Sequence, residues 1–218
     1  MPAPSFKILV VSLPGSPKRD VMRQRLSAQH LTWEWVDGVR IATMEEIPWW
    51  EQEGLEAYCI ARLKTTPEYV CRAVGCKRAM RKAIALAETC SEDWVLILQD
   101  DAVLAPAFRD RLEGLLSLVP YEAGCVMLHR GGSRVAEIDG WQRVTGDVRS
   151  MTAFAIRPSF ALIMSRALEN WNSETDRIWG HLVRQGEIIL SPIPMLVTCS
   201  QKQSDIIGGI PELRWLWK

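Results

Sequence analysis

The sequence lacks three features that would point directly to a function: a Cys-x-x-Cys pair, a glycine-rich phosphate motif and an excess of one charge. Its six cysteines are scattered through 218 residues, which argues against a structural zinc site and favours reduced thiols. Neither Gly-x-Gly-x-x-Gly nor a Walker sequence occurs, which argues against a standard dinucleotide or P-loop site. Basic and acidic residues number 26 each, so general attraction to nucleic-acid backbones is not expected.

Long apolar runs are also absent. The run near the N-terminus, Ile8 to Leu13, is too short to span a membrane and lacks a cleavage site of the signal-peptide type. We therefore expect a cytoplasmic protein with no transmembrane segment. No internal repeat or low-complexity linker is visible, so residues 1–218 are predicted to form a single domain with a sizeable core.

Short apolar runs alternate with segments of helical periodicity along the chain. We predict strands over 6–13, 31–36, 94–99, 125–128, 150–156 and 188–190, a hairpin or loop over 135–148, and helices over 18–29, 68–89, 105–118, 160–170 and from about 174. This alternation predicts an α/β fold with a mostly parallel central sheet flanked by helices.

The strand that begins at Trp94 ends abruptly in Gln99-Asp100-Asp101. The carboxyl ends of strands are where ligands bind in open α/β sheets. Two adjacent carboxylates repel each other, and Mg²⁺ or Mn²⁺ is the simplest compensation because hard cations prefer oxygen ligands. The alternative is an Asp-rich turn without chemistry.

Further polar groups follow other predicted strands. The turn at residues 14–17 opens a helix rich in cations, including Lys18 and Arg19, which is either a diphosphate pocket or a solvated basic face. Asp37 follows the second strand and either holds a ribose or base or forms a turn with Gly38. His129 follows another strand, as a general base, a phosphate contact or an ordinary loop histidine.

The helix over 68–89 carries an apolar face and several cations. Lys77 and Arg78 are further candidates for phosphate contacts. Gly75 lies in the middle of this helix, where it lowers helix propensity by about 1 kcal/mol but lets another backbone approach closely. Together with the acidic pair, these cations suit a metal-bound nucleotide-diphosphate substrate.

An ordered set of segments carries a family resemblance. The set is Val10–Leu13 with Ser16–Arg19, Trp33–Gly38, Gly75-Cys76, Leu96–Ala102, Thr152–Ile156, Asp176 and Ser204–Ile206. In this order it resembles glycosyltransferase family 25, the lipopolysaccharide-biosynthesis and collagen-galactosyltransferase group. The strand that ends in Asp-Asp is the sharpest match, and the resemblance covers most of the chain.

The resemblance implies a GT-A-type fold, a Rossmann-like nucleotide-diphospho-sugar transferase. It implies inverting transfer of a hexose from a UDP-sugar to the hydroxyl of a glycan or lipopolysaccharide-type acceptor, with Mn²⁺ or Mg²⁺ as cofactor. The implied roles are metal binding by Asp101 with Asp100, donor binding by Ser12, Leu13, Arg19, Asp37, Lys77, Arg78 and Asp100, and base catalysis by Asp176 with Asp147 as the second choice.

Four positions depart from the family pattern. Gln99 stands where the family has Glu, Ala73 replaces another Glu, and Ala79 and Met80 replace a Ser-His pair. These departures leave open a degenerate member that binds a nucleotide sugar or glycan without transfer. A phage-type transferase that modifies hydroxylated DNA bases is a third possibility, supported by local cation clusters and opposed by the neutral net charge.

Overall fold

The structure, a computed structural model, describes residues 3–51, 66–131, 135–148, 150–169, 171 and 173–200. Its centre is an eight-stranded sheet of order β2-β1-β3-β8-β5-β9-β7-β6, beside a two-stranded sheet of β4 and β10. The strands are β1 Phe6–Ser12, β2 Glu34–Asp37, β3 Trp94–Gln99, β4 Ala102–Leu104, β5 Cys125–Met127, β6 Val135–Ile138, β7 Trp141–Val144, β8 Ala153–Ile156, β9 Ile189–Ser191 and β10 Val197–Cys199.

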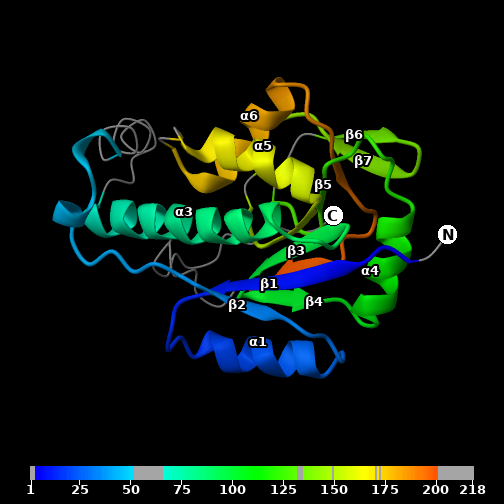
Figure 1. Ribbon diagram of the computed structural model, residues 1–218, viewed down its shortest axis with the longest axis horizontal. Helices are drawn as coiled ribbons and strands as arrows, with labels where there is room; N and C mark the ends of the chain where they lie inside the picture. Colours follow the sequence, from blue (N-terminus) through cyan, green and yellow to red (C-terminus); the bar gives the residue numbers. More distant parts are fainter. Residues whose placement is uncertain are drawn as a thin grey trace.

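Helices cover both faces of the large sheet (Figure 1). They are α1 Lys18–Ser27, α3 Pro67–Glu88, α4 Phe108–Ser117, α5 Pro158–Glu169 and α6 Ile178–Arg184, with 3-10 turns η1 Met44–Glu46 and η2 Thr175–Arg177. Residues 49–51 are helical as well. None of the described helices combines the length and apolar character needed to cross a bilayer.

The large sheet is mostly parallel in direction. Strands β2, β1, β3, β5, β9 and β6 run one way, whereas β8 and β7 run the other. The predicted α/β fold is therefore confirmed, with β8 inserted antiparallel between β3 and β5. The apolar run of β8 is buried at all four positions, and such a run carries no signal of strand direction.

Alternation along β1 divides the core into two layers. Leu9 and Val11 pack in a cluster with α3, α5 and α6, while Ile8 and Val10 pack in a second cluster with α1 and α4. Figure 1 shows α3 and α1 on opposite sides of β1. Successive side chains of a strand point to opposite faces, so one buried strand supplies both layers.

Several strand ends that carry polar residues meet at one edge of the sheet. Ser12 is paired with Asp37 across the β1–β2 ladder, and Val11 is paired with Gln99 across the β1–β3 ladder. Strand β5 runs in the same direction, so His129, two residues past its end, follows at this edge too. The acidic pair that follows β3 thus lies at the carboxyl edge, as expected.

Helix α3 passes very close to the chain that follows β2. A Cβ added at Gly75 would collide with the carbonyl oxygen of Val39. The predicted close approach of a backbone to this glycine is confirmed. Around it, Ile41, Ile47 and Val74 form a small separate apolar cluster.

The segment over 135–148 contains a hairpin, one of its two predicted forms. Strands β6 and β7 pair antiparallel, and Asp139 and Gly140 join them with φ angles of +47° and +80°, as a primed two-residue turn requires. The cysteines within the described residues are all free thiols. Cys59 and Ser204–Ile206, used in the sequence interpretation, lie outside the described residues.

Two glycines in helices give a matched test of this packing. We expect Gly75→Ala to lower the free energy of unfolding by about 1–3 kcal/mol, because the methyl group forces α3 away from Val39. Gly114→Ala in α4 meets nothing within 4 Å and should stabilise the protein by about 0.4–1 kcal/mol. Urea denaturation of both variants checks this, and equal effects at the two sites would contradict it.

Candidate functional site

The candidate site is built around the turn between β3 and β4. Asp100 accepts a hydrogen bond from the Ser12 hydroxyl, with 2.5 Å between Oγ and Oδ2. This contact joins the end of β1 to the turn after β3, so two predicted site residues lie together. A charge-assisted bond of this length also fixes the orientation of the Asp100 carboxylate.

Asp101 is held by the small β4–β10 sheet. The Ser200 amide donates to the Asp101 carbonyl oxygen at 2.9 Å, and the Cys199 thiol donates to Asp101 Oδ2 at 3.1 Å. The other carboxylate oxygen, Oδ1, is buried and has no hydrogen-bond partner among the described residues. A buried carboxylate oxygen without a donor is costly, and it is the group that a cation would satisfy.

Cys76 of α3 lies near both Asp101 and Asp176. Burial, together with the negative charges of Asp176 and Asp101, raises the pKa of the Cys76 thiol to about 12. Gln99 donates weakly to the same sulfur at 3.8 Å. Asp176, in the η2 turn, and Asp101 are therefore both near the middle of α3.

His129 belongs to the same neighbourhood. Burial lowers the pKa of this imidazole, and the nearby Asp101 charge acts in the opposite direction. Its Nδ1 atom lies 2.7 Å from the Ser150 hydroxyl. The backbone amide of His129 donates to the Ala153 carbonyl at 3.1 Å, so both ends of the residue are fixed.

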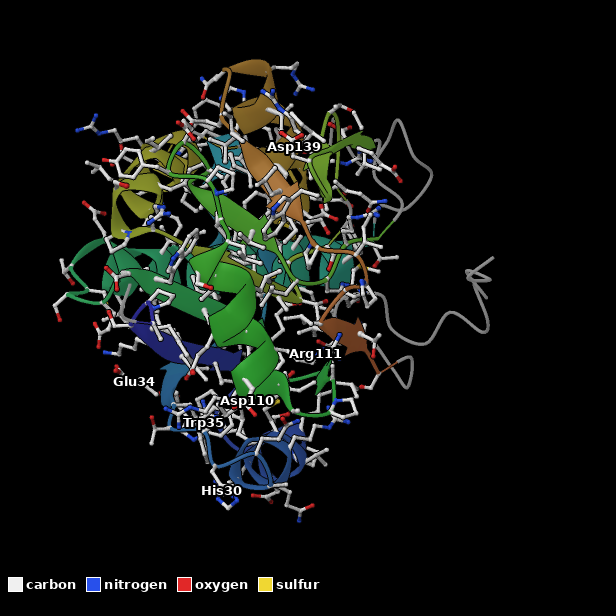
Figure 2. All side chains as sticks on the ribbon, turned by 90° about the vertical axis from the view of Figure 1, so that its right-hand side faces the viewer. His30, Glu34, Trp35, Asp110, Arg111 and Asp139 are labelled. Atoms are coloured by element: carbon white, nitrogen blue, oxygen red, sulfur yellow. The ribbon has the colours of Figure 1, made fainter. Side chains whose placement is uncertain are left out.

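Arg19 and Asp37 are paired with each other. One Arg19 nitrogen donates to Asp37 Oδ1 at 2.5 Å and to the Ser12 carbonyl at 2.8 Å, and the guanidinium carbon lies 5.0 Å from the centre of the Trp35 ring. Figure 2 shows Trp35 on the side of the sheet covered by α1. The buried Nε of Arg19 has no partner among the described residues, so one donor remains for a ligand.

Leu13 lies beside this pair. A Cβ at Gly38 would approach the Leu13 nitrogen to 3.1 Å, and the Gly38 amide donates to the Ser12 carbonyl at 2.8 Å. The ends of β1 and β2 are thus joined by backbone contacts, and their predicted site residues Ser12, Leu13, Arg19 and Asp37 form one group.

Lys77 and Arg78 are engaged elsewhere. The Lys77 ammonium is buried in an ion pair with Glu51 and donates to the Trp171 carbonyl at 3.1 Å. Arg78 contacts the same Glu51 carboxylate at 3.4 Å. These contacts give both residues a structural role that their spacing on the predicted helix did not reveal.

Asp147, the second-choice base, is held by arginines. Arg177 donates to its Oδ2 at 2.7 Å, and Arg184 lies 3.5 Å from its Oδ1. These contacts occupy both carboxylate oxygens of Asp147, which leaves less room for an acceptor hydroxyl to reach it.

Three residues of this neighbourhood were not selected from the sequence. Ser150 and Thr152 hydrogen bond to each other at 3.1 Å, and Cys199 binds Asp101. Ser and Thr at the start of a strand have ordinary local roles, and a lone cysteine almost 100 residues from Asp101 has no motif. The pairing of β4 with β10 brings Cys199 to the site.

The arrangement suits a metal ion that takes one carboxylate ligand from the protein. No group of three or more His, Cys, Asp or Glu side chains within the described ranges is placed to hold a metal. Mg²⁺ in phosphate-handling sites commonly takes one or two carboxylates and fills its other positions with water and phosphate oxygens. The unpartnered Oδ1 of Asp101 suits this single-carboxylate kind of site.

Comparison with known proteins gives structural likenesses only. No family model and no curated protein matches the sequence. The chain is similar to a glycosyltransferase involved in the glycosylation of the major capsid of PBCV-1, with a TM-score of 0.48, 10% identity, and coverage of 93% of this chain and 95% of that one. It is also similar to mannose-1-phosphate geranyltransferase from Thermus thermophilus, with a TM-score of 0.40, 14% identity, and coverage of 86% and 73%.

The buried Lys77–Glu51 pair provides a test of the structural role of Lys77. We expect Lys77→Met to lower the free energy of unfolding by about 3–5 kcal/mol, because it leaves the buried Glu51 carboxylate with the more distant Arg78 contact. Adding Glu51→Leu should recover most of this loss in thermal and urea denaturation. Full stability of the single variant would show that the pair does not stabilise the fold.

Proposed function

We propose that this chain is a GT-A-type glycosyltransferase that moves a hexose from a UDP-sugar to the hydroxyl group of a glycan or similar acceptor, with Mn²⁺ or Mg²⁺ as cofactor. The observation that carries the proposal is the buried, unpartnered Oδ1 of Asp101 at the carboxyl edge of the sheet. A metal ion bound there would neutralise charge on the diphosphate as it leaves.

The donor would lie along the ends of β1, β2 and β3. Asp37 and the Arg19 Nε atom offer an acceptor and a donor to the nucleoside at one end. Asp101 would lie at the diphosphate. Asp100 precedes it in the turn after β3 and is held by the Ser12 hydroxyl. In this proposal, Asp37 and Arg19 would contact the nucleoside, and Asp101 would contact the diphosphate through the metal ion.

Transfer needs a base for the acceptor hydroxyl. Asp176 would take the hydroxyl proton while the acceptor oxygen bonds to the anomeric carbon, and the bond from that carbon to the diphosphate oxygen breaks with its electron pair leaving on UDP. Asp176 and Asp101 are both close enough to Cys76 for their charges to raise its pKa. Asp147 is the weaker candidate because Arg177 and Arg184 already hold its carboxylate.

Asp101→Asn tests the cofactor site directly. We expect the amide to keep accepting from Cys199 but to bind a divalent cation poorly, so transfer should fall roughly 100-fold or more while thermal unfolding of the free protein stays cooperative. UDP should raise the melting temperature of the wild type in the presence of Mn²⁺, and this rise should be lost in the variant.

The matched control is Asp110→Asn on the exposed surface of α4, labelled in Figure 2. It makes the same chemical change away from the candidate site and should leave transfer and the Mn²⁺-dependent rise unchanged. Equal activity of Asp101→Asn and the wild type would overturn the proposed site. Donor binding without hydrolysis or transfer by the wild type would instead favour a non-catalytic binder, and salt-sensitive binding to modified DNA would favour a DNA-modifying enzyme.

The assignment of the base is tested separately. Asp176→Asn should lower kcat by roughly 100- to 10,000-fold and leave Mn²⁺-dependent UDP binding intact, because the carboxylate acts on the acceptor proton. Asp147→Asn should destabilise the protein through loss of its arginine contacts while kcat changes by less than about 10-fold. The reverse pattern, measured by steady-state transfer and calorimetry, would assign the base to Asp147.

A further inference from the structure

A chain of hydrogen bonds leads from His129 to Thr152. His129 Nδ1 lies 2.7 Å from Ser150 Oγ, which lies 3.1 Å from Thr152 Oγ1. Thr152 is also near Cys199, whose Sγ lies 3.1 Å from Asp101 Oδ2. Three side chains from two separate segments of the sequence thus form one path that ends beside Cys199.

Cys199 is the hydrogen-bond donor to Asp101. A carboxylate only accepts hydrogen bonds, so Cys199 donates its S–H to Asp101.

Each hydroxyl has a single proton, and this fixes the remaining directions. The Ser150 hydroxyl donates to the Thr152 oxygen at 3.1 Å. Ser150 donates to Thr152, so its oxygen accepts from the Thr152 amide at 3.1 Å and from His129 Nδ1. The proton of the imidazole therefore lies on Nδ1.

The other ring nitrogen of His129, Nε2, is then a hydrogen-bond acceptor. Burial lowers the pKa of His129 against the raising effect of Asp101, which favours the neutral ring. A neutral ring with its proton on Nδ1 carries a lone pair on Nε2. Such a nitrogen repels phosphate oxygens and accepts a hydrogen bond from a hydroxyl group.

We propose that Nε2 of His129 accepts a hydrogen bond from a hydroxyl group of the hexose being transferred, held in this orientation by Ser150 and Thr152. This inference rests on the proposed function, because the hexose would adjoin the diphosphate at Asp101. His129 follows β5 at the same edge, and two backbone amides, from Leu128 and His129, bind the Ala153 carbonyl at 3.1 Å and fix its position. His129 would thus contribute to the choice among UDP-hexoses.

The test compares variants on complete donors and on donors that lack one hydroxyl. His129→Asn keeps an N–H for Ser150 and removes the Nε2 acceptor. With UDP-glucose or UDP-galactose, whichever the wild type turns over, we expect kcat/KM to fall roughly 10- to 100-fold. The wild type should reject one monodeoxy donor by a similar factor, and His129→Asn should no longer distinguish that donor from the complete one.

Two further variants separate orientation from folding. Ser150→Ala frees the ring to place its proton on Nε2 and should lower discrimination partly, whereas Ser150→Thr keeps the hydroxyl and should restore it. His30→Asn is the matched control, because His30 lies beside α1 (Figure 2) with a φ of +52°, which Asn tolerates. It should behave as the wild type.

A measurement without activity tests the proton position itself. The chain has three histidines, so the ¹⁵N signals of His129 are assigned by their loss in His129→Asn. We expect a pyrrole-type Nδ1 and a pyridine-type Nε2, and the reverse pattern would overturn the inference. Unchanged donor discrimination in His129→Asn would also overturn it while transfer by the wild type upholds the proposed function. Failure of the wild type to bind or turn over any UDP-hexose with Mn²⁺ would overturn both.

Discussion

The short ladder between β4 and β10 is the interaction on which the candidate site depends. Three residue pairs join segments almost 100 residues apart, and the Ser200 amide extends the ladder to the Asp101 backbone. Without this pairing Asp101 would lie in an open turn after β3, with both carboxylate oxygens in water. With it, one oxygen accepts from Cys199 and the other is buried without a donor. The same few hydrogen bonds thus leave a buried carboxylate oxygen without a donor, and a bound cation would stabilise its negative charge.

Local ion pairs limit what these basic side chains could contribute to binding a diphosphate. Arg19 binds Asp37, Lys77 binds Glu51 and Arg177 binds Asp147. Cations already paired with carboxylates contribute little further positive potential to a ligand. In the proposed reaction, the charge on the leaving diphosphate would therefore be offset mainly by a bound metal ion rather than by basic side chains. This agrees with the choice of Asp101, and not of a basic cluster, as the centre of the site.

The order of most strands and helices, without the short β4 and β10, could be predicted from the sequence because burial leaves a clear pattern in it. Asp37 and Asp100 were selected for the same reason, since each stands at or just past the end of an apolar strand, whereas Ser12 was selected from the family resemblance. The partners of Lys77 could not be predicted, because a cation on a helix looks alike whether it faces solvent or a buried Glu51. The contact of Cys199 with Asp101 was also inaccessible, since β10 has only three residues and no periodicity long enough to recognise.

The positions that motivate a non-catalytic binder are explained largely by packing. Ala79 and Met80 are buried in the core where α3 covers the sheet, and Ala73 is buried in the small cluster near Val39. A Ser-His pair or a Glu at these positions would place polar groups in apolar surroundings. Gln99 is the exception, because its side-chain amide reaches Cys76 at the site while its backbone N–H donates to the Thr152 carbonyl. An uncharged amide there removes one negative charge beside Asp100 and Asp101, which lessens the repulsion that a bound cation must offset. The departures therefore leave the acidic pair and its supporting contacts in place, and the choice between transfer and binding rests on Asp101 and Asp176.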